Sequence, residues 1–377
     1  MPEKYDSVKT SDGRAWIKPS CRPELREVDA VVFDCDGVLV DARRSYDATI
    51  TEVAERILCE NIGISSLGKN LTPNLIRQLR RTGGFNNDWD STYALILFSI
   101  MALPESEARR LAHEGLPNGS RESLRISPRE IGTVVDEFCS TTADLGIGCE
   151  AVNSYLHSAH MSRDSASVIS RVQEQLGYPG SPPRSFLSTL FDEMYHGPKL
   201  FRRMYGVQAH HYKGRGFIEN ERLLIRRKDF ETLSRLLGGR RLALITGRPY
   251  LATKHVLREL MKYFNRKASV FIGDFDVHPK LAPQLSQFRK PSGRSLIHAQ
   301  RNLSSDTLLY VGDSAEDARM VEDARRLKVR VLFAGIYGTG IGHEEQSKFF
   351  RDRGADLILP TVRQVPIILR AAKNEKR

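Results

Sequence analysis

Six short runs of β-branched and other apolar residues, alternating with amphipathic stretches, constrain the fold of this chain more than any other sequence feature. Each run has the length of a buried strand, and each amphipathic stretch has the spacing of a helix. Strands that alternate with helices form a parallel sheet covered on both faces, an α/β fold. The strands are expected at residues 28–33, 241–245, 268–272, 308–311, 329–333 and 356–359, and the helices at 229–237, 250–264, 315–327 and 362–372.

The strand pattern is interrupted after the first run. From about residue 45 to residue 224 the sequence consists of successive helical segments separated by turn clusters. We therefore expect an α/β core made of residues 1–42 and 226–377, with a helical domain inserted at residues 43–225. Residues 1–27 form an N-terminal extension, which is expected to fray together with the basic end from Lys373 to Arg377.

Composition narrows the class of protein. The 377 residues are 40% hydrophobic and 27% charged, which excludes a disordered or collagen-like chain. The longest apolar stretch, residues 93–103, is too short to span a membrane, and the N-terminus lacks the apolar core of a secretory signal. Five cysteines without a C-x-x-C pair indicate reduced thiols. We expect a soluble, cytoplasmic protein without a membrane partner.

The charge balance leaves the partner open. With 57 Lys and Arg against 46 Asp and Glu, the net charge is +11, which suits nucleic acid, an anionic membrane surface or a phosphorylated substrate. The basic residues lie in short clusters instead of one long block. A small phosphorylated substrate is favoured over nucleic acid only because of the acidic motifs that follow.

The first strand run ends in two carboxylates, in the segment Asp34-Cys35-Asp36-Gly37. Ligands of open α/β sheets bind at the carboxyl ends of the strands. Gly37 permits a sharp turn that aims both acids at one point. An ordinary Asp-Gly turn after a strand explains the same residues equally well.

A second strand run is followed by Thr246-Gly247-Arg248-Pro249. The Thr246 hydroxyl and the nearby backbone N–H groups could hold phosphoryl oxygens. Taken alone, Thr246 fits better as a cap of the next helix. Arg248 fits a phosphate clamp or a solvated surface charge equally well.

A third strand run is followed by Gly312-Asp313-Ser314, with Asp317 three residues later. Ser314 and Asp317 match a helix capping box. Asp313 is harder to explain, because an acid at this sheet edge repels the other carboxylates unless a cation lies among them. All-oxygen ligation favours Mg²⁺. The acids that would surround the cation are Asp34, Asp36, Asp313 and Asp317.

In their order along the chain, these motifs resemble those of the haloacid dehalogenase (HAD) superfamily of phosphotransferases. Asp34-x-Asp36-Gly37 is similar to the first motif, Thr246 to the second and Gly312-Asp313-x-x-x-Asp317 to the fourth. Lys290-Pro291 resembles the third motif, although the sequence before it departs from the usual pattern and makes Lys280 a second candidate. The resemblance covers roughly residues 28–42 and 226–360, and the position of the insertion is typical of the branch with a helical cap there.

The resemblance implies a Rossmann-like HAD core with a large inserted α-helical cap. It also implies a Mg²⁺-dependent phosphohydrolase, in which Asp34 attacks phosphorus to form an aspartyl-phosphate and Asp36 is the general acid and base. Mg²⁺ would be held by Asp34, Asp313, Asp317 and the backbone carbonyl of Asp36, and the catalytic set would be Asp34, Asp36, Thr246 and Lys290.

Substrate contacts are expected from both parts of the chain. Gly247 and Arg248 follow the second motif, and Asn86 and Asn87 lie in a glycine-rich polar turn of the insertion that we expect at the mouth of the active site. The insertion resembles an uncharacterised subgroup of the family, with extra material at about residues 104–183. It does not identify the phosphorylated metabolite.

Two other functions stay open. A phosphomutase of the same superfamily uses the same residues but passes the phosphoryl group to a second hydroxyl. A basic nucleic-acid-binding protein with a non-catalytic HAD core would use the net charge of +11. The sequence indicates neither the substrate nor the oligomeric state.

Overall fold

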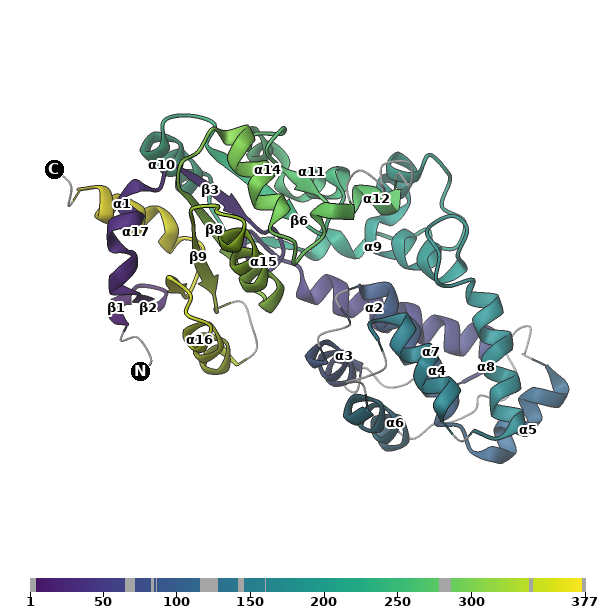
Figure 1. Cartoon of the computed structure of the whole chain (residues 1–377). Coiled ribbons are helices and arrows are strands. Elements are labelled where there is room, and N and C mark those ends of the chain that lie inside the picture. The colour runs from purple at the N-terminus through teal and green to yellow at the C-terminus, as the bar shows by residue number, and fades with distance from the viewer. Residues whose placement is uncertain are drawn as a thin grey trace. The chain divides into compact units, whose positions relative to one another are not determined.

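The chain forms two compact units in a computed structural model (Figure 1). One unit contains Met1–Arg43 and Glu221–Arg377, and we call it the core unit; the other contains Arg44–Asn220, and we call it the insert. The structure describes residues 5–64, 72–82, 85, 87–115, 128–141, 146–159, 161–277, 286–338 and 342–374.

The core unit is built on an eight-stranded sheet with the order β1-β2-β10-β9-β8-β3-β6-β7. From β10 to β7 each strand is parallel to its neighbour, and all six of these strands are the ones that the sequence predicts. The expected α/β fold with a parallel sheet is therefore confirmed. The strands are β1 (Asp6–Thr10), β2 (Gly13–Ile17), β3 (Ala30–Phe33), β6 (Leu242–Thr246), β7 (Val270–Phe271), β8 (Leu308–Gly312), β9 (Val331–Ile336) and β10 (Leu357–Leu359).

Alternate side chains of the strands fill two apolar layers, because successive residues of a strand point to opposite faces of the sheet. Val32, Tyr310 and Phe333 belong to one buried cluster together with residues of two helices, α14 (Arg294–Leu303) and α15 (Ala315–Arg326). Phe33, one position after Val32, instead makes an edge contact with Phe230 of α10. Every residue of β3, β6, β8 and β9 is buried, as expected for a sheet covered on both faces.

Helices cover these two faces. Helix α14 packs on α15 and both contact the sheet, while α1 and α10 pack on α17. The helix expected at residues 250–264 is α11 followed by the 3-10 helix η5. The core helices are α1 (Arg22–Glu27), α10 (Arg227–Leu237), α11 (Tyr250–Leu257), α12 (Asp274–Val277), α14 (Arg294–Leu303), α15 (Ala315–Arg326), α16 (His343–Asp352) and α17 (Gln364–Asn374), with η1 (Pro19–Cys21), η5 (Arg258–Tyr263) and η7 (Ser286–Phe288).

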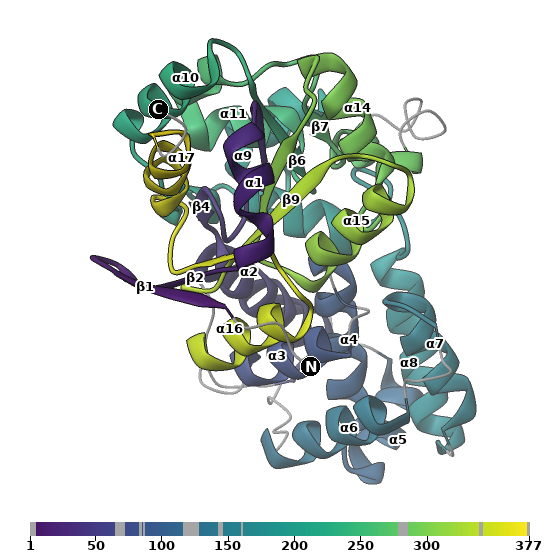
Figure 2. The ribbon, with the colours of Figure 1, turned by 60° about the vertical axis from the view of Figure 1, so that its left-hand side comes forward.

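The N-terminal extension does not fray over its described residues, so that expectation was wrong. Strands β1 and β2 form a hairpin that extends the sheet antiparallel to β10 (Figure 2). Trp16 of β2 packs against the ring of Tyr337, 5.5 Å away between centroids, and under the guanidinium of Arg351. The Tyr337 hydroxyl donates to the carbonyl of Arg14 at 2.8 Å. These partners lie more than 300 residues away in sequence, so no local pattern indicates them.

A short ribbon joins the two chain segments that lead into and out of the insert. Strand β4 (Val40–Asp41) pairs antiparallel with β5 (Arg222–Leu223), and the N–H of Leu224 donates to the carbonyl of Leu39 at 2.8 Å. The sequence-based boundary places residues 221–225 in the insertion. The structure groups them with the core unit, because this ribbon holds them there.

The insert is entirely helical in its described parts. Its most apolar stretch is the centre of α4, where every residue from Ser91 to Ile100 is buried. Helix α9 bends at Gly197, whose φ is 74°, directly before Pro198. Across the described ranges of the whole chain, no helix combines the length and apolarity needed to cross a membrane. The helices are α2 (Arg43–Arg56), η2 (Ile57–Ile62), α3 (Thr72–Arg81), α4 (Asp88–Met101), α5 (Glu105–Glu114), α6 (Pro128–Thr141), α7 (Cys149–Ser158), α8 (Arg163–Leu176), α9 (Phe186–Tyr205) and η4 (Phe217–Asn220).

The hairpin contacts lead to a stability prediction. Trp16→Ala removes the ring that packs on Tyr337, and we expect the free energy of unfolding to fall by about 1–3 kcal/mol. Val8→Ala, in the same hairpin but with Val8 47% exposed, serves as the matched control and should change it by less than about 0.5 kcal/mol. Chemical denaturation of both variants tests this. Equal losses in the two variants would contradict the assigned packing role.

Candidate active site

Three polar segments meet at one edge of the sheet because of strand register. Phe33, the last residue of β3, lies level with Leu244 of β6 and Val311 of β8. Asp34 follows directly and donates its N–H to the carbonyl of Val311 at 2.9 Å. The carboxyl ends of β3, β6 and β8 thus bring Asp34 next to the segments that begin at Thr246 and Gly312.

Two glycines allow the acidic segments to approach each other. Gly37 has a φ of 71°, and a Cβ on it would lie 1.8 Å from the Oδ2 atom of Asp313. A Cβ on Gly312 would lie 2.5 Å from the Cβ of Asp317. A side chain at either position would displace one of the two carboxylates, so both glycines are needed for this arrangement.

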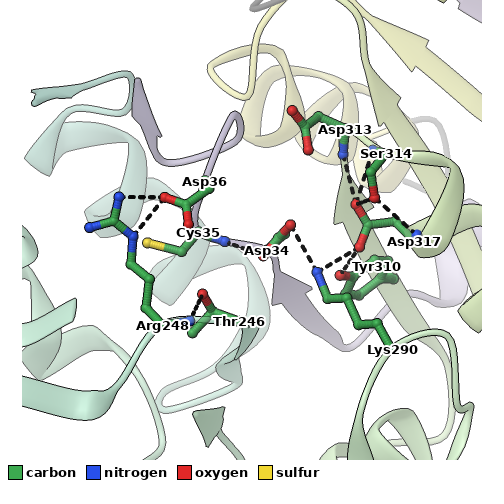
Figure 3. A network of polar contacts seen from close by, with 10 residues as sticks. All are labelled: Asp34, Cys35, Asp36, Thr246, Arg248, Lys290, Tyr310, Asp313, Ser314 and Asp317. Carbon is green, nitrogen blue, oxygen red and sulfur yellow. Dashed lines mark hydrogen bonds and ion pairs between the residues drawn. The ribbon is translucent and has the colours of Figure 1, made fainter. Parts of the chain in front are cut away.

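The acidic cluster contains Asp34, Asp313 and Asp317, whose nearest carboxylate oxygens all lie within 4.8 Å of one another. Lys290 links two of them, with its Nζ 2.8 Å from Asp34 Oδ2 and 2.7 Å from Asp317 Oδ1 (Figure 3). The other oxygen of Asp34 accepts the N–H of Cys35 at 2.7 Å. Lys290 therefore stands beside Asp34, and the second candidate, Lys280, lies outside the described residues.

The carboxylate of Asp317 is saturated by protein donors. Its Oδ1 atom accepts Lys290 Nζ and the Tyr310 hydroxyl, both at 2.7 Å. Its Oδ2 atom accepts the Ser314 hydroxyl at 2.7 Å and the N–H groups of Ser314 and Asp313 at 3.0 and 3.1 Å. The predicted capping box of α15 is thus present. Asp317 is thus the anchor of Lys290, and its expected role as a metal ligand stays a prediction.

Burial is the largest influence on the pKa of Asp34 and of Asp313, whereas Lys290 and hydrogen bonds outweigh burial and lower the pKa of Asp317. Burial raises the pKa of Asp34 to about 7, the positive charge of Lys290 acting against this and the neighbouring carboxylates adding to it. It likewise raises the pKa of Asp313 well above its usual range, with Asp317 and Asp34 adding to the effect. Burial by itself would lower the pKa of Lys290, but the negative charges of Asp317 and Asp34 outweigh it and hold this pKa well above the ordinary lysine value.

The charge of this cluster fits a divalent cation. Three carboxylates and one ammonium group leave a formal charge of −2 when all are ionised. The donors that remain are carboxylate oxygens, which Mg²⁺ prefers in proteins. Asp34 and Asp313 therefore offer the ligand type and the unbalanced charge that a Mg²⁺ site needs.

On the other side of Asp34, a second ion network surrounds Arg248 (Figure 3). The Nε of Arg248 donates to Asp36 Oδ1 at 2.6 Å, and its Nη1 lies 2.8 Å from Glu221 Oε2. Arg248 is 2% exposed, so the alternative of a solvated surface charge was wrong. Its backbone N–H donates to the buried Thr246 hydroxyl at 3.1 Å. The structure thus pairs Arg248 with Asp36 and with Glu221, an acid to which the sequence assigned no role.

The remaining predicted substrate contacts have different surroundings. Gly247 is exposed in the turn after β6, with open space where a Cβ would be. Asn87 is the N-cap of α4, and its Oδ1 accepts the N–H of Trp89 at 3.0 Å. Asn86 lies outside the described residues. The expected role of the Asn86–Asn87 turn at the mouth of the site stays a prediction.

Three residues of the site escaped the sequence reasoning. A signal exists for Tyr310, because a tyrosine within an apolar strand needs a partner for its hydroxyl when buried. The spacing of residues in the sequence assigns no role to Glu221 or to Gln346. The Nε2 of Gln346 donates to the carbonyl of Asp313 at 2.7 Å. Both residues come from segments whose position relative to the strand ends depends on the whole fold.

Comparisons with known proteins give structural likenesses only. No family model and no curated protein matches the chain. A solved structure from the Northeast Structural Genomics Consortium matches with a TM-score of 0.57 and 17% identity over 91% of this chain and 98% of its own. A phosphatase from Thermococcus thioreducens matches with a TM-score of 0.46 and 21% identity, over 81% and 92% of the two chains. A HAD family hydrolase from Deinococcus radiodurans, with bound phosphate and sodium, matches with a TM-score of 0.41 and 13% identity, over 92% and 97%.

The first likeness covers 91% of this chain, so it includes most of the insert as well as most of the core unit. The sequence resemblance predicts the same arrangement: a parallel strand order, acids after β3 and β8, and a helical unit that follows β3. The chain therefore has an α/β fold similar to that of the first structure, with a large helical unit inserted after β3 and the short strand β4.

Proposed function

We propose that this protein is a Mg²⁺-dependent phosphohydrolase that acts on a small phosphorylated metabolite through an aspartyl-phosphate. One observation carries the proposal: the Asp34 carboxylate lies between the acids and lysine of one network and the Asp36 carboxylate of another. A nucleophile, a cation site and an acid thus meet at one sheet edge. An intact set of this kind favours an enzyme over a nucleic-acid-binding protein with a relic core.

The cation would be held by Asp34 and Asp313, with the backbone carbonyl of Asp36 as a further oxygen. When bound, Mg²⁺ polarises the phosphoryl oxygens and reduces the repulsion between two anions. Lys290 supplies a positive charge beside the attacking oxygen, 2.8 Å from Asp34 Oδ2. Asp317, which also accepts the Tyr310 hydroxyl, holds Lys290 in that position.

The first step is nucleophilic displacement at phosphorus. An oxygen of the Asp34 carboxylate attacks the phosphoryl group, and the bond between phosphorus and the ester oxygen breaks. Asp36 gives its proton to the departing oxygen, which leaves as an alcohol. The product of this step is an acyl phosphate on Asp34.

The second step returns the enzyme to its starting state. A water molecule attacks the phosphorus of the acyl phosphate and transfers a proton to Asp36. The bond between phosphorus and the Asp34 oxygen breaks, which releases inorganic phosphate and restores the carboxylate. A phosphomutase would admit a second hydroxyl in place of water, so release of free phosphate separates the two functions.

Replacement of the nucleophile is the direct test. Asp34→Asn should lower kcat by more than about 10³-fold, because the amide cannot form the acyl phosphate. The folded state should lose no stability, since burial already penalises the charged form of Asp34. A panel of phosphorylated sugars, acids and nucleotides, assayed for Mg²⁺-dependent phosphate release, provides the measurement. A kcat of Asp34→Asn close to that of the wild type would exclude the covalent mechanism.

The cation site predicts a pH-dependent stabilisation by Mg²⁺. Because burial raises the pKa of Asp34 from 3.8 to about 7, the metal-free folded state binds protons that the unfolded chain releases. The contribution of Asp34 to the free energy of unfolding is therefore full below about pH 4 and is lost as the pH rises through 7. Mg²⁺ binds the ionised carboxylates, so the increase in Tm on adding Mg²⁺ should be small at pH 5 and larger at pH 7.5.

Thermal unfolding with Mg²⁺ or with EDTA at both pH values measures this difference. Asp313→Asn removes one ligand and should abolish most of the increase at pH 7.5, whereas Asp352→Asn, an exposed acid of α16, should leave it intact. An increase in Tm of the same size at pH 5 and pH 7.5, or one that survives in Asp313→Asn, would argue against the proposed site.

A further inference from the structure

A buried arginine joins two carboxylates beside the proposed active site. Arg248 contacts Asp36 Oδ1 through Nε at 2.6 Å and Nη2 at 2.5 Å. It contacts Glu221 through Nη2 at 2.9 Å and Nη1 at 2.8 Å. The side chains of Arg248 and Glu221 are 1% and 0% exposed, while that of Asp36 is 34% exposed. Only the acid at the end of this network therefore reaches solvent.

The contacts of Arg248 argue against its expected role as a phosphate clamp. All three of its side-chain nitrogens already lie within 2.9 Å of a carboxylate oxygen. Its single positive charge stands between two acids, so the network carries a formal charge of −1 when both are ionised. A phosphate would have to displace a buried carboxylate and enter a region without excess positive charge.

The position of Glu221 is determined by the ribbon of β4 and β5. Glu221 directly precedes β5, and β4 follows the turn that contains Asp36 and Gly37. The N–H of Gly37 donates to the carbonyl of Val40 at 2.8 Å, which ties that turn to the ribbon. Glu221 and Asp36 are thus brought to the two ends of one guanidinium by the same local pairing.

We propose that Arg248, held by Glu221, is a positioning residue for Asp36. The inference rests on the proposed function, because it assigns a task to the acid and base of that reaction. The guanidinium engages only Oδ1 of Asp36, and Oδ2 makes no hydrogen bond to any residue in the described part of the chain. The clamp therefore fixes the rotation of the carboxylate and leaves Oδ2 for the leaving oxygen and then for water.

If Arg248 and Glu221 position Asp36, their replacement should lower kcat/KM by an amount that depends on the leaving group. An acid matters most when the departing oxygen is strongly basic and matters little when it leaves readily as an anion. Misplacing Asp36 should therefore impair the cleavage of phenyl phosphate much more than that of p-nitrophenyl phosphate. Loss of a phosphate contact would instead impair both esters equally, because both carry the same phosphoryl group.

The test compares kcat/KM for these two esters in Glu221→Gln and Arg248→Lys. Glutamine keeps the shape of Glu221 without its charge, and lysine keeps the charge of Arg248 but lacks the planar fork that engages Asp36 and Glu221 through three nitrogens. We expect kcat/KM for phenyl phosphate to fall by about tenfold or more, and that for p-nitrophenyl phosphate by less than about threefold. Asp36→Asn sets the reference, with the same selectivity and a loss of about 10²–10⁴-fold for phenyl phosphate.

A surface ion pair of the same composition provides the matched control. Arg227 and Glu231 are joined at 2.9 Å on α10 with side chains 58% and 45% exposed. Arg227→Lys and Glu231→Gln should leave both esters unaffected. If Arg248→Lys fails to fold, Glu221→Gln alone decides the question, because it removes no buried positive charge.

The outcomes separate the two proposals. Equal losses for both esters, or no loss, in a folded Glu221→Gln variant would overturn the positioning role while wild-type hydrolysis upholds the proposed function. If the wild type releases no phosphate from either ester or from the metabolite panel with Mg²⁺, the proposed function fails and the positioning role fails with it.

Discussion

Repulsion among three crowded carboxylates is the constraint on which the rest of the site depends. Asp34, Asp313 and Asp317 bring oxygens within 4.8 Å of one another where solvent screens them poorly. Lys290 offsets part of this repulsion by bridging two of the acids. Burial, with the remaining repulsion added to it, raises the pKa of Asp34 and of Asp313, which is the condition that a divalent cation would relieve.

The sheet makes this crowding possible. Parallel strands place their carboxyl ends at one edge, so residues almost 280 positions apart, such as Asp34 and Asp313, become neighbours through the pairing of β3 with β8. The start of α15 then supplies backbone and hydroxyl donors to Asp317. Glycines at positions 37 and 312 leave the space that the carboxylates occupy. Fold and site are therefore consequences of the same strand register.

Two cations serve two separate networks at this edge, and their chemistry differs accordingly. Lys290 is a compact charge that can lie between Asp34 and Asp317. Arg248 is a planar fork that binds Asp36 through two nitrogens and turns its other side to Glu221. The charge beside the nucleophile and the charge beside the acid are thus supplied by different residues, although the Asp36 carboxylate still adds to the raised pKa of Asp34.

Local sequence was sufficient for the α/β class, the six parallel strands and the acids at their ends, because strand length, alternation and turn residues act over a few positions. It could not assign charge partners. Arg248 was left between a phosphate clamp and a surface charge, and Glu221 was given no role. A buried charge pairs with whichever opposite charge the folded chain brings to it. The ordered N-terminal hairpin also depends on distant contacts, such as Trp16 with Tyr337. Such pairs have no spacing rule, so they emerge only when the whole chain is packed.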